Sequence, residues 1–253
     1  MSTIDLRPSV ESRSGELDGQ TVVVIGGSSG IGLETARLAH AEGADVVITG
    51  RDRTRLEQAA NDVGAATVAA FDATDFERLA TFFADLPAPF DHVLVTGPGP
   101  YYAPLADFDF DAARRDVEAH LFLPMQVARD AAPKMRAGGT LLFMGGTGGR
   151  AAGVGMTLIS ALTAAGPAIV RNLALELAPV RVNMIAAGFV DTPLSATLLA
   201  GRIDERREEL RRTLPIGRVI GPGDIALLAV QLMTNTAVTG ATYDIDGGQQ
   251  LLA

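Results

Sequence analysis

The amino-acid sequence predicts an α/β protein in which a single domain contains a doubly wound, seven-stranded parallel sheet. Seven short runs are apolar and rich in β-branched residues, as expected of strands that are covered on both faces. Longer segments with helical spacing separate these runs, and a glycine cluster directly follows the first of them. Strand and helix patterns that alternate in this way predict parallel strands joined by right-handed crossovers.

The seven strands are expected at regular intervals along the chain. The first run is TVVVI, and most of the others also contain valine or isoleucine, whose branched side chains favour extended backbone. The expected strands are residues 21–25, 45–49, 66–71, 91–95, 139–144, 180–185 and 241–245.

Helices are expected between these strands, the first over residues 31–42. Thr74 and Glu77 have the spacing of a capping box, which predicts a helix start at Thr74. A long amphipathic helix is expected over 108–135 with a bend at Pro124, and Gly221 with the proline after it begins another. Residues 151–170 carry no charge and are long enough to span a bilayer, but their glycines and proline favour a buried helix.

The composition excludes several classes of function. The formal charge of -9 would repel nucleic acid and anionic membranes, which leaves a small molecule as the expected partner. The chain has no cysteine, and its three histidines lack the spacing of metal ligands, so no metal site is expected. Residues 1–16 have no apolar segment typical of a signal sequence, which predicts a flexible arm before a domain at 17–253 and a cytoplasmic protein.

The glycine cluster has the pattern of a phosphate-binding turn. It lies between the first expected strand and the first expected helix, where glycines allow the backbone to approach a pyrophosphate. Free N–H groups and the positive end of the helix dipole would meet the phosphate charge, and two serine hydroxyls can add donors. The alternative is a tight turn without a ligand. The predicted nucleotide contacts are Gly26, Ser28, Ser29, Gly30, Ile31 and Gly32.

The end of the second strand indicates which dinucleotide is bound. An acidic residue there would select NAD, whereas an arginine accommodates the 2′-phosphate of NADP. The sequence has Gly50 followed by Arg51, whose guanidinium can bind a phosphate through two hydrogen bonds. NADP is therefore the predicted cofactor, although Arg51 can also be a solvated side chain beside an Asp52 that caps the next helix.

From about Leu17 to the C-terminus, the chain resembles the short-chain dehydrogenase/reductase family. Gly26, Gly30 and Gly32 match the glycines of the family motif, with Ile25 in place of its threonine. The stretch LALELAPVRVNMIAAGFVDTP at 173–193 is similar to the segment that contains the family's Pro-Gly motif, with Ala187 in place of the proline. YDIDGG at 243–248 resembles its last strand and turn.

This resemblance implies a Rossmann fold with strand order 3-2-1-4-5-6-7, usually in a homotetramer or homodimer. It also implies a substrate lid at about 192–214 and an adenine contact at Asp72 and Ala73. The nicotinamide side would be contacted by Gly188, Val190 and Thr192. Thr96 and Gly97 are further predicted cofactor contacts, in the segment that stands in place of the family's Asn-Asn-Ala-Gly stretch after the fourth strand.

The family's catalytic positions hold other residues in this chain. The resemblance places the family's tyrosine at Ile159, its lysine at Thr163 and its asparagine at His120. The serine position falls on Gly146 or, one residue later, Thr147. No shift of the alignment restores the tyrosine and lysine, because neither residue type occurs between Arg150 and Arg171. Pro167 cannot donate to the Thr163 carbonyl, which predicts a kink or a free carbonyl there.

Three functions remain open from the sequence. The first is an NADP-dependent oxidoreductase with a relocated proton donor, for which Tyr102 and His120 are the candidate catalytic residues. Tyr102 can instead be a packing residue, and His120 can simply bond a backbone carbonyl. The second function is a catalytically inactive NADP-binding sensor or partner subunit, and the third is a chain whose nucleotide site is vestigial.

Overall fold

The computed structural model describes residues 15–64 and 67–252. These residues form one seven-stranded parallel sheet with the order β3-β2-β1-β4-β5-β6-β7, which confirms the predicted fold class and strand order. Residues 1–14 of the expected N-terminal arm lie outside the described residues, and Leu17 is already fully buried. The strands are β1 (Thr21–Ile25), β2 (Asp45–Gly50), β3 (Thr67–Ala70), β4 (Phe90–Val95), β5 (Met135–Gly146), β6 (Arg181–Ala187) and β7 (Thr242–Ile245).

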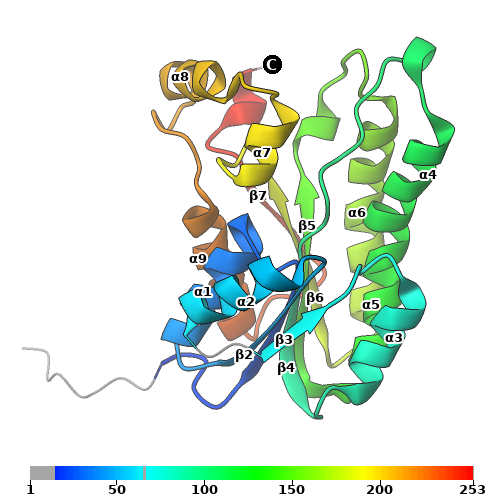
Figure 1. Cartoon of the computed structure of the whole chain (residues 1–253), viewed down its shortest axis with the longest axis vertical. Coiled ribbons are helices and arrows are strands. Elements are labelled where there is room, and N and C mark those ends of the chain that lie inside the picture. Colours follow the sequence, from blue (N-terminus) through cyan, green and yellow to red (C-terminus); the bar gives the residue numbers. More distant parts are fainter. Residues whose placement is uncertain (1–14, 65–66, 253) are drawn as a thin grey trace, which may run out of the picture.

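Helices cover both faces of this sheet, and a short pair of helices lies beyond one edge. In Figure 1, α1, α2 and α9 lie on one face, and α3, α4, α5 and α6 lie on the other. Helices α7 and α8 lie near the tip of β5, where the parallel strands end (Figure 1). The α-helices are α1 (Gly30–Ala41), α2 (Arg53–Val63), α3 (Phe76–Asp85), α4 (Phe110–Val117), α5 (Leu123–Ala131), α6 (Thr157–Glu176), α7 (Pro193–Leu198), α8 (Ile203–Thr213) and α9 (Pro222–Thr234).

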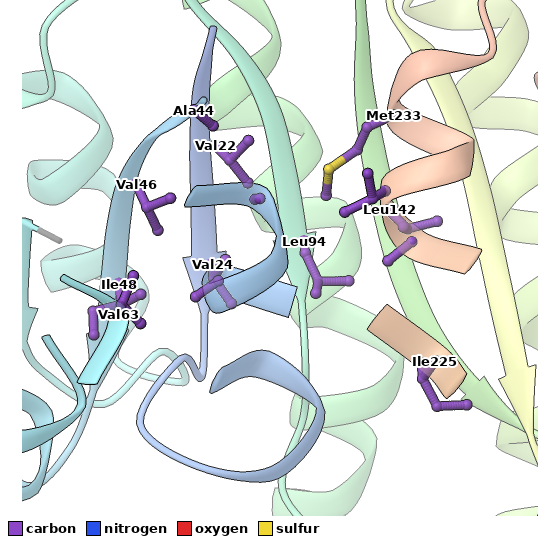
Figure 2. Close-up of a cluster of buried hydrophobic side chains, with 14 of the residues drawn as sticks. Val22, Val24, Ala44, Val46, Ile48, Val63, Leu94, Leu142, Ile225 and Met233 are labelled. Carbon is purple, nitrogen blue, oxygen red and sulfur yellow. The ribbon is translucent and has the colours of Figure 1, made fainter. Parts of the chain in front are cut away.

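Alternation along the strands divides the core into two layers. Val22 and Val24 of β1 face one helical layer, whereas Val23 and Ile25 face the other, because successive side chains of a strand point to opposite faces. Figure 2 shows the first layer, which β1, β2, β4 and β5 form with α2 and α9. Its labelled side chains are Val22, Val24, Ala44, Val46, Ile48, Val63, Leu94, Leu142, Ile225 and Met233.

Aspartates cap the starts of α2 and α3, and only the second start differs from its prediction. Helix α3 begins after Asp75, whose carboxylate accepts the Arg78 N–H, so the capping box expected at Thr74 is wrong. Thr74 lies before this cap, and its N–H and hydroxyl both donate to the Asp72 carboxylate. Asp52 does cap α2, by accepting the N–H of Arg55 at 3.0 Å.

The helix expected over 108–135 is a composite of several segments. A π-helical turn, Glu118–Phe122, joins α4 to α5, and a 3₁₀ turn, Ala132–Lys134, follows α5. The irregularity begins six residues before the expected bend at Pro124, which occupies the first turn of α5. Single π turns of this kind often occur at functional sites, and this one contains His120.

Helix α6 buries one side of its surface and exposes the other. Ile159, Leu162, Gly166 and Val170 are buried, whereas Ala161 and Ala164 are exposed, so the helix expected to be buried is only partly so. Among helices of the described ranges, α6 alone has the length and apolar composition of a membrane span, which is weak evidence for one. It continues through Pro167, and no side chain of the described residues donates to the Thr163 carbonyl.

Two cations bind the carbonyl groups at which helices end. The ammonium group of Lys134 donates to the carbonyls of Phe83, Ala84 and Leu86, at the end of α3. The buried guanidinium of Arg181 donates to carbonyls at and after the end of α9 and to Gly138. Positive charge at these positions satisfies carbonyl groups that have no partner within their own helix.

Candidate functional site

The glycine loop joins β1 to α1 in a conformation that only small residues permit. Gly26 has φ of 88°, and a Cβ atom on it would lie 2.2 Å from the Thr96 hydroxyl oxygen. A Cβ on Gly32 would lie 2.3 Å from the Gly26 carbonyl oxygen. Ser29 is the N-cap of α1 but makes no side-chain capping bond. The loop therefore exposes backbone at a helix N-terminus, which fits a dinucleotide pyrophosphate.

The end of β4 is attached to this loop. The hydroxyl of Thr96 lies 3.0 Å from the Ile25 carbonyl and 3.1 Å from the Gly26 carbonyl, to which it can donate. Gly97 is more open, because the nearest atom to a Cβ there is Nε2 of His120 at 3.8 Å. Thr96 thus fixes the glycine loop through hydrogen bonds, while Gly97 leaves open space next to it.

Arg51, Asp72 and Ala73 lie at the ends of β2 and β3, on the side of the site predicted to bind adenosine. Arg51 is exposed, and Ser28 lies against Gly50, where a Cβ would be 3.1 Å from the serine hydroxyl. Burial opposes ionisation of Asp72, but hydrogen bonds from Thr74 and the nearby Arg51 charge outweigh it, so the Asp72 pKa is lowered. An exposed guanidinium at the carboxyl end of β2 is the kind of group that can bind the phosphorylated ribose of NADP.

A cavity of about 770 Å³ lies at the carboxyl ends of the central strands, between the glycine loop and α7–α8. Many of its lining side chains are apolar, including Phe143, Met144 and Leu162. Its lining includes eight of the predicted site residues: Ile31, Thr96, Gly97, Tyr102, His120, Gly188, Val190 and Thr192. The other predicted contacts lie outside its lining: Gly26, Ser28, Ser29, Gly30, Gly32, Arg51, Asp72 and Ala73.

The segment after β6 closes this cavity over the glycine loop. Gly188 packs so closely on Asp246 that a Cβ would lie 2.7 Å from the Asp246 side chain. Thr192 caps α7 by accepting the Ser195 N–H, and its methyl group lies 3.4 Å from a Cβ built on Gly30. Thr192 is therefore held close to the start of α1, while Gly188 lies against Asp246.

Helix α8 is attached to the same segment by an ion pair. The Arg207 guanidinium binds both carboxylate oxygens of Asp191, at 2.9 and 2.8 Å. Between α7 and α8, Ala200 and Gly201 both have positive φ, at 46° and 90°. The two helices form a short flap over the cavity, connected by a tight left-handed turn.

The α6 side of the cavity has no ionisable group. Ile159 is buried, and Thr163 lies one helical turn later, beside Gly149. Gly146 also lines the cavity, whereas Thr147 is buried and donates its N–H to the Ala187 carbonyl. The ionisable side chains that line this cavity therefore come from other elements: Tyr102 follows β4, His120 lies in the π turn, and Glu205 and Glu209 lie in α8.

Tyr101 and Tyr102 differ in their surroundings. The Tyr101 hydroxyl accepts the Asp109 N–H at 2.7 Å, and its ring packs against Phe108, so it is a structural residue near the start of α4. Tyr102 lines the cavity and is 50% exposed. Partial burial of its hydroxyl, assisted by the negative charge of Asp116, raises the Tyr102 pKa.

His120 is paired with a carboxylate that the sequence prediction missed. Its Nδ1 lies 3.0 Å from Oδ1 of Asp116 and 3.1 Å from the Asp116 carbonyl oxygen. Burial disfavours the charged imidazole, but the Asp116 groups and the Pro98 carbonyl outweigh burial and raise the His120 pKa. The sequence does contain one indication of this pair: Asp116 and His120 are four residues apart within the predicted long helix, a spacing that brings two side chains together.

Comparisons with known proteins agree with this architecture. Residues 25–250 match the family model described as Enoyl-(Acyl carrier protein) reductase. The chain is 33% identical to galactitol 2-dehydrogenase (L-tagatose-forming) from Cereibacter sphaeroides, covering 92% of this chain and 95% of that protein. It is 27% identical to the short-chain dehydrogenase/reductase ATR9 from Stachybotrys chlorohalonatus, over 91% and 96% of the two chains.

A solved structure gives a similar result. BdcA, crystallised in complex with NADPH, superposes with a TM-score of 0.83 and 26% identity, covering 92% of this chain and 95% of that chain.

Proposed function

Because the chain belongs to the short-chain dehydrogenase/reductase family, we propose that it is an NADP(H)-dependent oxidoreductase with a non-standard proton donor. The observation that carries this proposal is the shared cavity. Its lining includes His120 and Tyr102 together with Gly188, Val190 and Thr192, which are predicted to contact the nicotinamide side. Its α6 wall, where the family's tyrosine and lysine positions fall, has Ile159 and Thr163.

The nucleotide is proposed to be NADP because of the residues at the end of β2. Arg51 would bind the 2′-phosphate, and Gly50 provides no carboxylate for an unphosphorylated ribose. The NADPH bound in the BdcA crystal structure is consistent with this choice. Gly26, Gly30 and Gly32 would hold the pyrophosphate at the N-terminus of α1.

When bound, the cofactor supplies the hydride, and the protein has to position the substrate and move a proton. Apolar groups such as Phe143, Met144 and Ile159 would exclude water from the substrate. The proton would come from His120 or Tyr102, on the opposite wall. General acid assistance is worth about 10²- to 10⁴-fold, so a substrate that needs little of it, such as an activated alkene or iminium, suits this cavity.

We also infer that α7 and α8 form the substrate lid expected at about 192–214, because both helices line the cavity.

The exposed apolar side chains of the outer helical layer suit a homodimer or homotetramer. These are Phe122, Met125 and Leu175, of which Leu175 is 81% exposed. A cytoplasmic location remains part of this proposal, and sedimentation would test the assembly.

Calorimetry with NADPH and NADH tests the nucleotide, and turnover tests the chemistry. We expect NADPH to bind more tightly, and Arg51→Ala to weaken NADPH about 10- to 100-fold while leaving NADH unchanged. Arg53→Ala is the matched control, because Arg53 pairs with Glu57 on the exposed side of α2. Equal affinity of wild type and Arg51→Ala for NADPH would refute the assignment.

Turnover should then be measured with carbonyl, enone and iminium compounds and NADPH. Oxidation of NADPH with any of these classes supports the oxidoreductase. Tight NADPH binding without oxidation would instead identify an inactive sensor or partner subunit, and absence of dinucleotide binding would identify a vestigial site.

A further inference from the structure

We propose that Asp116 is a positioning residue that holds His120 as the proton-exchanging group of the cavity, with Nε2 as the nitrogen that transfers the proton. This inference rests on the proposed function and chooses between the two candidate donors. It also assigns a role to a buried carboxylate that does not line the cavity.

The pair is built into the junction between α4 and the π turn. Asp116 is the penultimate residue of α4, and His120 is the central residue of the turn Glu118–Phe122. Side chains four residues apart lie on the same side of a helix, which brings the carboxylate beneath the imidazole. The exposed fractions of the two side chains are 4% and 21%, so only the histidine reaches the cavity.

The contacts of Nδ1 determine which nitrogen can titrate. Both of its neighbours, Oδ1 and the carbonyl oxygen of Asp116, accept hydrogen bonds and cannot donate them. The ring also has one uncharged acceptor beside it, the Pro98 carbonyl, but the two acceptors at Nδ1 include a carboxylate and favour the hydrogen of the neutral ring on Nδ1. Proton gain and loss is therefore assigned to Nε2, which lies beside Gly97 in the cavity wall.

The surroundings of the second carboxylate oxygen of Asp116 increase the influence of its negative charge on His120. Oδ2 is buried and makes no hydrogen bond with any side chain or backbone group in the described ranges. A buried carboxylate with so few donors is poorly compensated, and a charged imidazole is the group nearest to it that can compensate it. The folded chain thus favours the protonated state of His120.

The same negative charge acts in the opposite direction on Tyr102. Burial and Asp116 both make ionisation of its hydroxyl less favourable, which leaves Tyr102 a weak acid far from neutrality. The pKa of His120 is instead raised above its ordinary value by Asp116 and the Pro98 carbonyl, which favours the protonated imidazole that a general acid requires. Tyr102 then remains as a hydrogen-bonding side chain for the substrate.

Among the described residues, the other charged groups that line the cavity lie within α8 or at its N-cap. They are Arg202, Glu205, Arg206 and Glu209, two of each sign. Arg206 and Glu209 form an ion pair at 2.7 Å, which reduces the net charge that they present. The carboxylate of Asp116 is therefore the charge that dominates at His120.

The decisive measurement is a titration of the His120 ring by NMR in the free protein, with its signals identified by their loss in His120→Gln. We expect a pKa above 6.5, a neutral state protonated at Nδ1, and a decrease of about one unit or more in Asp116→Asn. Asparagine keeps a carbonyl oxygen that can accept from Nδ1 but removes the charge. Asp111→Asn is the control, because that carboxylate of α4 is 78% exposed.

Turnover against pH gives the second readout. kcat/KM for reduction should fall as pH rises through the His120 pKa, and this limb should move to lower pH in Asp116→Asn but not in Asp111→Asn. His120→Gln should lose about 10²- to 10⁴-fold in turnover, whereas its NADPH affinity is retained.

The two proposals fail in different ways. A His120 pKa that Asp116→Asn does not change, or a neutral ring protonated at Nε2, would overturn the positioning role, whatever the cofactor does. A ring that titrates as expected while the pH profile does not follow it would overturn the role in proton transfer. Loss of NADPH binding in the wild type would refute the proposed function and leave the ring titration interpretable.

Discussion

Gly32→Ala tests whether close approach of the glycine loop to α1 is what creates the nucleotide site. The alanine Cβ would lie 2.3 Å from the Gly26 carbonyl oxygen and 3.2 Å from the Gly27 Cα. Because ordinary contacts begin near 3.4 Å, the Gly26 carbonyl must move by about 1 Å. Gly32 does not have positive φ, so the substitution introduces a steric clash without conformational strain.

A displacement of this size would misalign the N–H groups that are proposed to bind the pyrophosphate. We expect the Kd for NADPH to increase about 100-fold, which corresponds to about 2.7 kcal/mol, by analogy with the cost of similar misplacements at reacting centres. The clash should also lower the free energy of unfolding by about 1–3 kcal/mol. Calorimetry gives the first quantity, and urea unfolding gives the second.

Gly223→Ala is the matched control for this experiment. Gly223 also lies in the first turn of a helix, α9, and a Cβ there would meet no atom within 4 Å. This variant should bind NADPH like the wild type and be at least as stable, because alanine favours a helix by about 1 kcal/mol over glycine. If Gly32→Ala binds NADPH within about threefold of the wild type, the steric reasoning is refuted.

Two further predictions concern stability. Arg181→Met should lower the free energy of unfolding by about 3 kcal/mol and Tm by about 6–12 °C, because it leaves buried carbonyls at the end of α9 without a donor. A decrease of Tm by less than about 2 °C would contradict this. Burial lowers the pKa of His92 to about 4, so the unfolded chain binds a proton below pH 6.5 that the folded chain does not. The free energy of unfolding should therefore fall by about 3 kcal/mol as pH falls from 6.5 to 4, and urea unfolding of His92→Gln should show a smaller pH dependence.

The sheet and the glycine loop could be predicted because their determinants are local. Runs such as TVVVI have four successive apolar residues, a pattern typical of strands that are buried on both faces. Gly26 and Gly32 lie between a strand and a helix, where their lack of a side chain has a direct steric reason. These features depend little on which other parts of the chain come near them.

The remaining features depend on contacts between side chains that apolar spacing does not describe. Periodicity shows that 108–135 is helical, but it does not show that the hydrogen-bond register changes to a π turn at Glu118. Asp116 resembles a surface carboxylate in the sequence, and its burial follows from packing against the cavity wall. The charge-free segment at 151–170 indicated burial, yet composition alone does not say what covers each side of α6.

Lys134 gives the protein a built-in reporter of its own folding. It is the only lysine of the chain, and its ammonium group is held by three carbonyls, one of them at 2.5 Å. Reagents that acylate amines need the neutral, free amine, which this position provides only when the end of α3 opens. The rate at which an acylating reagent modifies Lys134 should therefore follow that opening, without a label being introduced.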